Sequence, residues 1–293
     1  MAKQSDRRSG RKSFALNKVA GLAALLWICS AVATAAENRV LVPIFISAPI
    51  PGAFGSVWTT ELTARNDSDR GVEVGPLTGC AIPEGCGTFR PPHSTFRIGM
   101  SSLPNPNAGV FLRVDDPDAI TFQLRVQDLS RQSETWGTSI PVVRERDVHT
   151  TPLRLIDIPV GSGFRSALRV YHFDPIQDLP QAAVRVRIYD MCGVGQFDHD
   201  CPTAPLAEAI LVLKKESQIE NNPNFPNFSM IGDLRAAFPQ LGNVEPIDIP
   251  AVNYHRPAAV RLEIEPLTPN LRFWAFVSVT NNETQHVTVI TPQ

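Results

Sequence analysis

Apolar and polar residues alternate along several short segments of the chain, which is the periodicity of a β-strand with one buried face. The clearest of these segments are residues 61–65, 111–114 and 183–188. Runs of residues that favour turns occur between such segments, at 66–71 and 115–118. Many short strands joined by turns are typical of a β-sandwich. The alternation therefore predicts an all-β fold.

The pattern of segments is repeated along the chain. Residues 108–114 correspond to 258–264, and residues 121–127 correspond to 271–277, both at an offset of 150 residues. Upstream of these segments, each copy has an alternating strand, a pair of cysteines and a further strand, in the same order. Because two cysteine pairs in matching places are hard to obtain by chance, we predict two tandem β-sandwich domains.

The boundary between the two predicted domains lies in the polar stretch 144–151, which follows the last strand of the first copy. We therefore assign residues 37–146 to β-sandwich domain 1 and residues 147–293 to β-sandwich domain 2. The second copy departs from the shared pattern in a long loop at about 214–246. Loops of this length are either functional or mobile, which makes this loop the first candidate for a binding surface.

Within that loop, residues 221–228 are rich in Asn and Pro, and we predict that they form neither strand nor helix. A short helix is predicted at about 232–238, ended by Pro239. Phe225 and Phe228 need either a partner or a groove on their own domain to cover their rings. Packing of both rings onto the sandwich is the favoured interpretation, and binding of a partner is the alternative.

The first 36 residues have the order of a secretory signal peptide, with a basic segment, an apolar run at 19–32 and small residues at the end. The cleavage positions that the small residues offer follow Ala33, Ala35 and Ala36. The strongly apolar core, 19–28, is ten residues long, whereas a membrane-spanning helix needs about 20. A cleaved leader is therefore favoured over an uncleaved anchor, and we predict export to the periplasm, the cell surface or the outside.

Export determines how the cysteines are interpreted. Four remain after cleavage, namely Cys80, Cys86, Cys192 and Cys201. An even number in an oxidising compartment predicts two disulfides with three possible connectivities. The pairing of Cys80 with Cys86 and of Cys192 with Cys201 is favoured, because each bond closes a short loop inside one predicted domain. Neither pair has the C-x-x-C spacing of a zinc or redox site, so no metal is predicted there.

Charge argues against nucleic acid as a partner. The whole chain has 27 basic and 29 acidic residues, and the predicted leader contains six and one of these. The mature chain would then have 21 basic and 28 acidic residues, a formal net charge of −7. Such a protein is poorly matched to nucleic acid or to an anionic membrane, and we predict no stable membrane insertion after cleavage. Arg185 and Arg187 alternate on one predicted strand face, where a solvated outer face is favoured over a polyanion site.

The N-terminal third of the predicted mature chain carries a resemblance. Residues 42–47 and 51–66 resemble an uncharacterised group of secreted bacterial proteins. The spacing of Trp58, Glu61 and Asn66 is similar to an early strand and turn of Ig-like modules in bacterial surface proteins. This resemblance implies Ig-like sandwiches with adhesion, spacing or assembly roles, and it brings no catalytic residues with it.

The sequence contains no recognisable active site. It has no G-x-S-x-G elbow, no phosphate-binding loop and no dinucleotide fingerprint, so no cofactor is predicted. Residues 198–200 (Asp-His-Asp) and the aspartates within 115–118 could suggest a metal, but too few ligands converge and a calcium loop's spacing is missing. Glu263 and Glu265 share one predicted strand face, which is interpreted as a charged outer face rather than as a catalytic pair.

Four aromatic residues lie on predicted strands, namely Trp58, Trp136, Phe273 and Trp274. Because Phe273 and Trp274 are adjacent, their side chains point to opposite faces of the strand, and an exposed tryptophan could stack on a sugar ring. Burial in the core or between the domains is the default interpretation. The candidate partner-binding residues are Phe225, Phe228 and Trp274.

These observations lead to three hypotheses. The first is an exported, non-enzymatic structural or interaction protein, adhesion-like in character, with a protein or glycan partner. The second is a carbohydrate-binding accessory module that uses an exposed aromatic ring. The third and weakest is a metal-dependent extracellular hydrolase.

Overall fold

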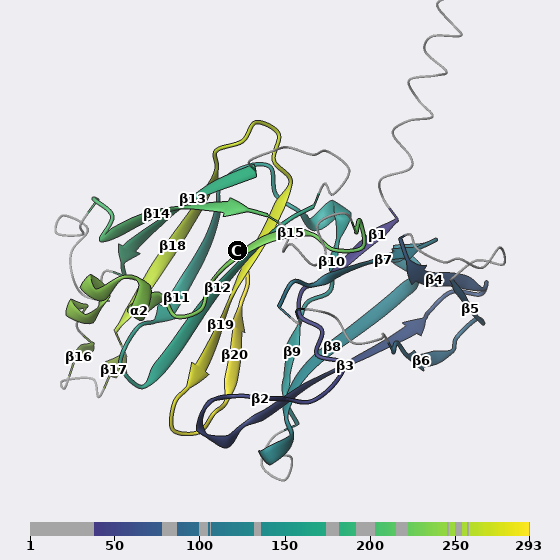
Figure 1. Cartoon of the computed structure of the whole chain (residues 1–293), viewed down its shortest axis with the longest axis horizontal. Helices are drawn as coiled ribbons and strands as arrows, with labels where there is room; N and C mark the ends of the chain where they lie inside the picture. The colour runs from purple at the N-terminus through teal and green to yellow at the C-terminus, as the bar shows by residue number, and fades with distance from the viewer. Residues whose placement is uncertain are drawn as a thin grey trace, which may run out of the picture. The chain divides into compact units, whose positions relative to one another are not determined.

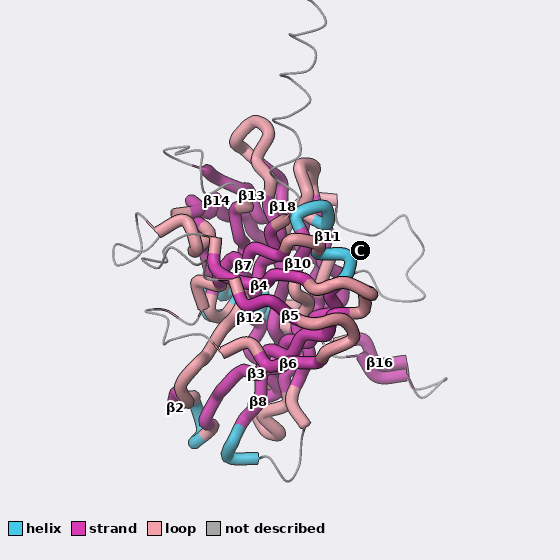
Figure 2. The backbone as a smooth tube through the Cα atoms, turned by 90° about the vertical axis from the view of Figure 1, so that its right-hand side faces the viewer, coloured by secondary structure: helices cyan, strands magenta, loops and turns pink. Residues whose placement is uncertain are grey.

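The computed structural model describes residues 38–293, apart from several internal segments and the last residue. The segments outside the description are 78–86, 100–104, 106, 132–135, 174–181, 192–202, 215–221, 245, 250–253, 257 and 293, and for 247–249 and 254–256 only the backbone is described. Residues from Asn38 onward form one compact unit. Its elements are almost all β-strands joined by loops (Figures 1 and 2). The all-β class predicted from the alternation is confirmed.

Residues 38–146, called the first half below, form two antiparallel sheets. One sheet contains, in spatial order, β10 (Val143–Arg144), β1 (Arg39–Val42), β7 (Val110–Val114), β4 (Val72–Pro76) and β5 (Thr88–Arg90). The other contains β2 (Ile50–Pro51), β3 (Val57–Asn66), β8 (Ile120–Asp128) and β9 (Thr138–Ile140), with β6 (Thr95–Arg97) paired to β3. Leu41 and Phe111 of the first sheet share one buried core with Leu62 and Leu124 of the second. The two sheets therefore pack face to face, as in a sandwich.

Residues 147–293, called the second half, form two further four-stranded antiparallel sheets and one hairpin. The first sheet contains β11 (Leu153–Pro159), β18 (Ala259–Pro266), β13 (Ala182–Asp190) and β14 (Ala207–Leu213). The second contains β15 (Asn227–Ile231), β12 (Phe164–His172), β19 (Phe273–Asn281) and β20 (Val287–Ile290). The hairpin pairs β16 (Ile247–Ile249) with β17 (Tyr254–Arg256). Leu155 and Val184 of the first sheet share a second core with Leu168 and Val277 of the other.

The two halves have the same strand order. The first half has two extra edge strands, β10 and β2. Without them, the spatial order of its strands is β1-β7-β4-β5 in one sheet and β6-β3-β8-β9 in the other. In the second half the strands in the same chain positions read β11-β18-β13-β14 and β15-β12-β19-β20. Each of these four sheets takes its strands from one side of residue 147 only. Whether each half folds as a separate domain stays a prediction.

Short helical turns connect the strands. The 3-10 turns are η1 (Ala53–Gly55), η2 (Pro117–Ala119), η3 (Leu129–Arg131), η4 (Glu145–Asp147) and η5 (Pro239–Asn243). The α-helix α2 (Leu234–Ala237) lies inside the predicted range 232–238. Its first turn is capped by Asp233, whose carboxylate accepts the backbone N–H of Arg235 at 3.1 Å.

The prediction that residues 221–228 contain no strand is wrong at their C-terminal end. Strand β15 begins at Asn227 and pairs antiparallel with β12, which places Phe228 opposite Tyr171. The hydrogen-bonding edge of β12 and the burial of the Phe228 ring outweigh the weak strand propensity of an Asn- and Pro-rich segment. The loop predicted at 214–246 is therefore interrupted by β15, an edge strand of the second half.

Candidate functional site

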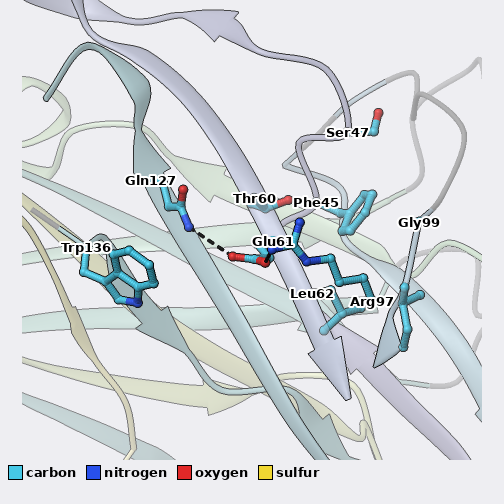
Figure 3. A pocket seen from close by; sticks show the side chains of 10 residues that line it. Phe45, Ser47, Thr60, Glu61, Leu62, Arg97, Gly99, Gln127 and Trp136 are labelled. Atoms are coloured by element: carbon cyan, nitrogen blue, oxygen red, sulfur yellow. Dashed lines mark hydrogen bonds and ion pairs between the residues drawn. The ribbon is translucent and has the colours of Figure 1, made fainter. Parts of the chain in front are cut away.

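A groove of about 610 Å³ runs along β3 on the outer side of the first half (Figure 3). Strand alternation places it there: Leu62 and Leu124 point into the core, so their neighbours Glu61 and Arg125 point outward. The antiparallel register sets Glu61 directly opposite Arg125 on β8. Two residues far apart in the chain therefore meet on one polar face.

Glu61 is the centre of this polar face. Its carboxylate lies 2.6 Å from Nη2 of Arg97 and 3.8 Å from Nη1 of Arg125. Nε2 of Gln127 donates a hydrogen bond to the same carboxylate at 3.3 Å. The Arg97 side chain is 81% exposed and the Arg125 side chain 11% exposed. Because two guanidinium groups surround one carboxylate, the cluster has a local excess of positive charge. The N–H donors of the exposed Arg97 side chain reach solvent.

Trp136 forms one side of the groove and is 77% exposed. The Cζ of Arg125 lies over its ring, 4.8 Å from the centroid, so a cation–π contact supports one face of the indole. The next residue, Gly137, has φ +90°, and a Cβ there would lie 2.5 Å from the carbonyl oxygen of Val126. Only glycine is tolerated at this position. The backbone therefore holds a large aromatic ring in solvent at a defined place.

Two segments that line the groove, 45–47 and 97–99, are hydrogen-bonded to β3 on either side of Glu61. The backbone N–H of Thr60 donates to the carbonyl of Ile46 at 3.1 Å, and the N–H of Ile46 donates to Oγ1 of Thr60 at 2.9 Å. Farther along the strand, the N–H of Ile98 donates to the carbonyl of Leu62 at 2.9 Å. These bonds build the groove on a rigid strand rather than on a free loop, which is how precise binding sites are supported.

The side chains that line the groove offer one paired carboxylate, hydrogen-bond donors and an aromatic ring. Among the described residues that line it, Glu61 is the single carboxylate, and Arg97 neutralises it. The groove also has an exposed ring, exposed guanidinium donors and a neutral amide, which together suit a ligand with both hydroxyl groups and an apolar face.

The three candidate partner-binding residues lie inside the molecule, and burial was the favoured interpretation for each of them. Phe225, Phe228 and Trp274 are 6%, 9% and 5% exposed. All three belong to the core of the first half, although their own strands and loops are in the second half. Tyr171 stacks with Phe228 at 6.1 Å and with Trp274 at 6.5 Å between ring centroids. Their apolar area is covered by the other half, so none of these rings offers a free face to a partner.

The other three aromatic residues of the predicted strands divide between surface and core. Phe273 is fully buried and Trp58 is half-buried, whereas Trp136 is exposed. The default interpretation of Phe273 and Trp274, burial rather than exposure of one ring, agrees with these values. Both faces of β19 are covered, one by its own sandwich and the other by the first half. Among the described tryptophans, Trp136 has the exposed ring.

The aspartates around Pro117 are engaged by arginines. Asp116 forms an ion pair with Arg70, and this hydrogen bond lowers the pKa of the Asp116 carboxyl below its ordinary value. Asp118 lies 2.6 Å from Arg146. Pro117 begins the 3-10 turn η2. The interpretation of this segment as a turn rather than a calcium loop agrees with these pairings.

The outer face of β13 and β18 is a ladder of opposite charges. Arg185 stands opposite Glu265, and Arg187 stands opposite Glu263. Nη1 of Arg187 lies 3.1 Å from Glu265, and Nη1 of Arg185 lies 3.4 Å from the same carboxylate. The two glutamates neutralise the two arginines, as expected for a solvated outer face.

Several predicted features fall outside the described residues. These are the leader at 1–36, the four cysteines Cys80, Cys86, Cys192 and Cys201, and the Asp-His-Asp triplet at 198–200. In the part of the chain that is described, no three His, Cys, Asp or Glu side chains gather where they could hold a metal ion. Nor do the described helices include one long and apolar enough to span a bilayer.

Sequence analysis did not identify Glu61, Arg97 and Arg125 as site residues. Alternation alone showed that Glu61 faces away from the core, and the resemblance included its position. The strand register that brings Arg125 and Arg97 against Glu61 depends on long-range pairing. No local pattern in the sequence encodes that register.

Comparison with protein-family models, with curated proteins and with solved structures finds no match for this chain.

Proposed function

We propose that this chain is an exported, non-enzymatic interaction protein, built from two tandem Ig-like β-sandwich modules, that holds a glycan partner in the Glu61 groove. The leader pattern and the cysteine pairs of the sequence support export and two disulfides. The identical strand order of the two halves supports tandem modules. The observation that carries the binding function is the exposed Trp136 ring, fixed over Arg125 beside the Glu61 cluster.

The size of the groove favours a saccharide over a protein. Small-molecule sites have volumes of about 300–1,000 Å³, and the groove, at about 610 Å³, lies in this range. Stable protein interfaces bury far larger, flatter surfaces. A pyranose ring presents C–H groups that pack on an indole face and hydroxyl groups that pair with a carboxylate, an amide and a guanidinium. Trp136 supplies the indole face, and the groups that pair with the hydroxyls come from Glu61, Gln127 and Arg97.

A glycan array followed by titration calorimetry tests this function, with the chain secreted and residues 1–36 removed. The mature chain should bind a defined subset of glycans. Trp136→Ala should weaken binding about 10-fold or more, because truncation of a central tryptophan typically costs over 1–2 kcal/mol. Phe89→Ala is the matched control, since Phe89 is 66% exposed on β5 in the other sheet of the first half, and it should leave binding unchanged.

The same glycans also test the non-enzymatic part of the proposal. After prolonged incubation with the mature chain, mass spectrometry should recover them intact. Cleavage that is lost in Glu61→Gln would show that the groove is catalytic. An array with no bound glycan, or equal binding by the wild type and Trp136→Ala, would remove the saccharide from the proposal.

A further inference from the structure

A second cavity, of about 390 Å³, lies between the sheet of β3 and β8 and the sheet of β12 and β19. The two halves supply different chemistry to its lining. The second half supplies Arg165, Arg169, Ser278 and Thr280. The first half supplies mainly apolar side chains, namely Ile44, Ile46, Ile50, Trp58, Val126 and Ile140, together with Asn107.

The polar wall follows from strand register. Arg165, Ala167 and Arg169 alternate along one face of β12, and their partners on β19 are Thr280, Ser278 and Phe276. The small side chains of Ala167 and Ser278 leave space between the two arginines. Two guanidinium groups therefore flank one recess, and hydroxyl groups form its floor.

Within the described part of the chain, the two guanidinium groups have no carboxylate beside them. Neither Arg165 nor Arg169 forms an ion pair within the described residues, and the lining contains no Asp or Glu. Nη1 of Arg169 donates to Oγ of Ser278 at 2.8 Å and Nη2 donates to Oδ1 of Asn107 at 3.1 Å. Among the described side chains, Arg165 donates to two neutral amide oxygens, those of Asn282 and Gln285. All of these partners are uncharged.

The environment of Arg169 makes the missing negative charge costly. Its Nε is buried without a hydrogen-bond partner in the described chain, and its Cζ lies over the Phe276 ring, 5.5 Å from the centroid. Burial lowers the pKa of the Arg169 guanidinium below its ordinary value, and Tyr171 acts in the opposite direction. A charge taken out of water without a partner is unfavourable unless something else supplies the opposite charge.

We propose that this cavity binds a small organic anion, whose anionic group lies between Arg165 and Arg169 and whose apolar body packs against the isoleucine wall of the first half. Because Oγ of Ser278 already accepts a hydrogen bond from Arg169, its own O–H remains available to donate to the anion. The cavity volume suits such a ligand. A carboxylate, sulfate or phosphate ester supplies the same chemistry, and the apolar wall selects against a bare inorganic ion.

This inference does not depend on the proposed glycan function. The groove uses Glu61 and Gln127 on one face of the β3–β8 sheet, whereas the cavity uses Trp58 and Val126 on the other. Failure of the two proposals can therefore be told apart. Trp136→Ala should leave anion binding unchanged even where it abolishes glycan binding.

Titration calorimetry on the mature chain tests the proposal with three probes: 2-naphthoate, its neutral isostere 2-naphthamide, and inorganic phosphate. The naphthoate should bind one per chain, and the amide should bind about 10-fold or more weakly, because hydrogen bonds to a charged group contribute about 1.5–3 kcal/mol. Phosphate should bind more weakly than naphthoate, since it leaves the apolar wall uncovered. Equal binding of acid and amide, tighter binding of phosphate, or no binding of naphthoate would overturn the proposal.

Two substitutions distinguish the contribution of positive charge to ligand affinity from that of cavity volume. Arg165→Gln should weaken naphthoate binding about 10-fold or more and leave naphthamide binding unchanged. Ala167→Leu keeps both arginines but fills the recess, and it should abolish binding of both. Arg154→Gln is the control for loss of one positive charge, because Arg154 is 68% exposed on β11, and it should bind like the wild type. If Ala167→Leu does not fold, Arg165→Gln decides, and unchanged naphthoate affinity in that variant refutes the site.

Discussion

Glu145 lies in the polar stretch that joins the two halves, and its removal should destabilise the protein strongly. Its carboxylate accepts hydrogen bonds from Nη2 of Arg39 at 2.5 Å and from Nη1 of Arg272 at 2.7 Å. The Nη2 of Arg272 also donates to the Glu145 backbone carbonyl at 3.1 Å. One buried carboxylate thus connects β1 of the first half with the segment before β19 of the second.

The size of the effect follows from burial. The Glu145 side chain is 2% exposed, that of Arg39 is 11% exposed and that of Arg272 is 27% exposed. Glu145→Ala removes the buried carboxylate that both guanidinium groups contact, and loss of one partner of a buried ion pair costs about 3–5 kcal/mol. For a chain of this size, each kcal/mol lowers the unfolding midpoint by roughly 2–4 °C.

Urea unfolding followed by tryptophan fluorescence measures this loss. Asp118→Ala is the matched control, because it removes a carboxylate that also contacts two arginines, Arg144 and Arg146, but is 63% exposed. It should cost less than about 1 kcal/mol. Glu145→Gln keeps the volume and removes the charge, so it should also be destabilising. A Glu145→Ala variant as stable as Asp118→Ala would refute the role of the buried carboxylate.

Three further predictions concern stability. Desolvation raises the pKa of the Asp128 carboxyl, but hydrogen bonds from the Val57 N–H and from Ser130 outweigh it and place this pKa below 3.8. Asp128 therefore contributes stability above pH 3.8 that is lost as the pH falls through the folded-state pKa. The urea midpoint of Asp128→Asn should therefore depend less on acid pH than that of the wild type. The same dependence of the midpoint on pH in both proteins would contradict this. Gly137→Ala should lower the free energy of unfolding by about 1–3 kcal/mol in thermal unfolding, because the left-handed backbone at this position suits glycine. The same substitution should weaken ligand binding in the groove. An unchanged melting temperature would refute backbone strain in the alanine variant. Tyr171→Phe removes the hydrogen bond that the Tyr171 hydroxyl donates to the Pro43 carbonyl between the halves. This should lower the free energy of unfolding in urea by about 1–3 kcal/mol. An unchanged free energy of unfolding would show that the hydroxyl is dispensable.

The alternation of side chains was sufficient to predict the fold class. Segments such as 61–65 and 183–188 lie on strands with the predicted inward and outward faces, because burial of every second residue is a local property of the chain. The outward direction of Glu61, Arg185 and Glu265 could be predicted in the same way. The short helix after Gly232 was also predictable, since capping and proline act within one turn.

The tertiary structure decided which of the outward faces meets another part of the protein. Arg165 and Arg169 have the sequence pattern of a solvated strand face, yet they line a cavity because the first half covers that face of β12. Trp274 and Phe228 are buried for the same reason, whereas Trp136 is exposed and has Arg125 over one face of its ring. A two-residue period distinguishes the two faces of a strand, but it carries no information about the distant surface that packs on either one.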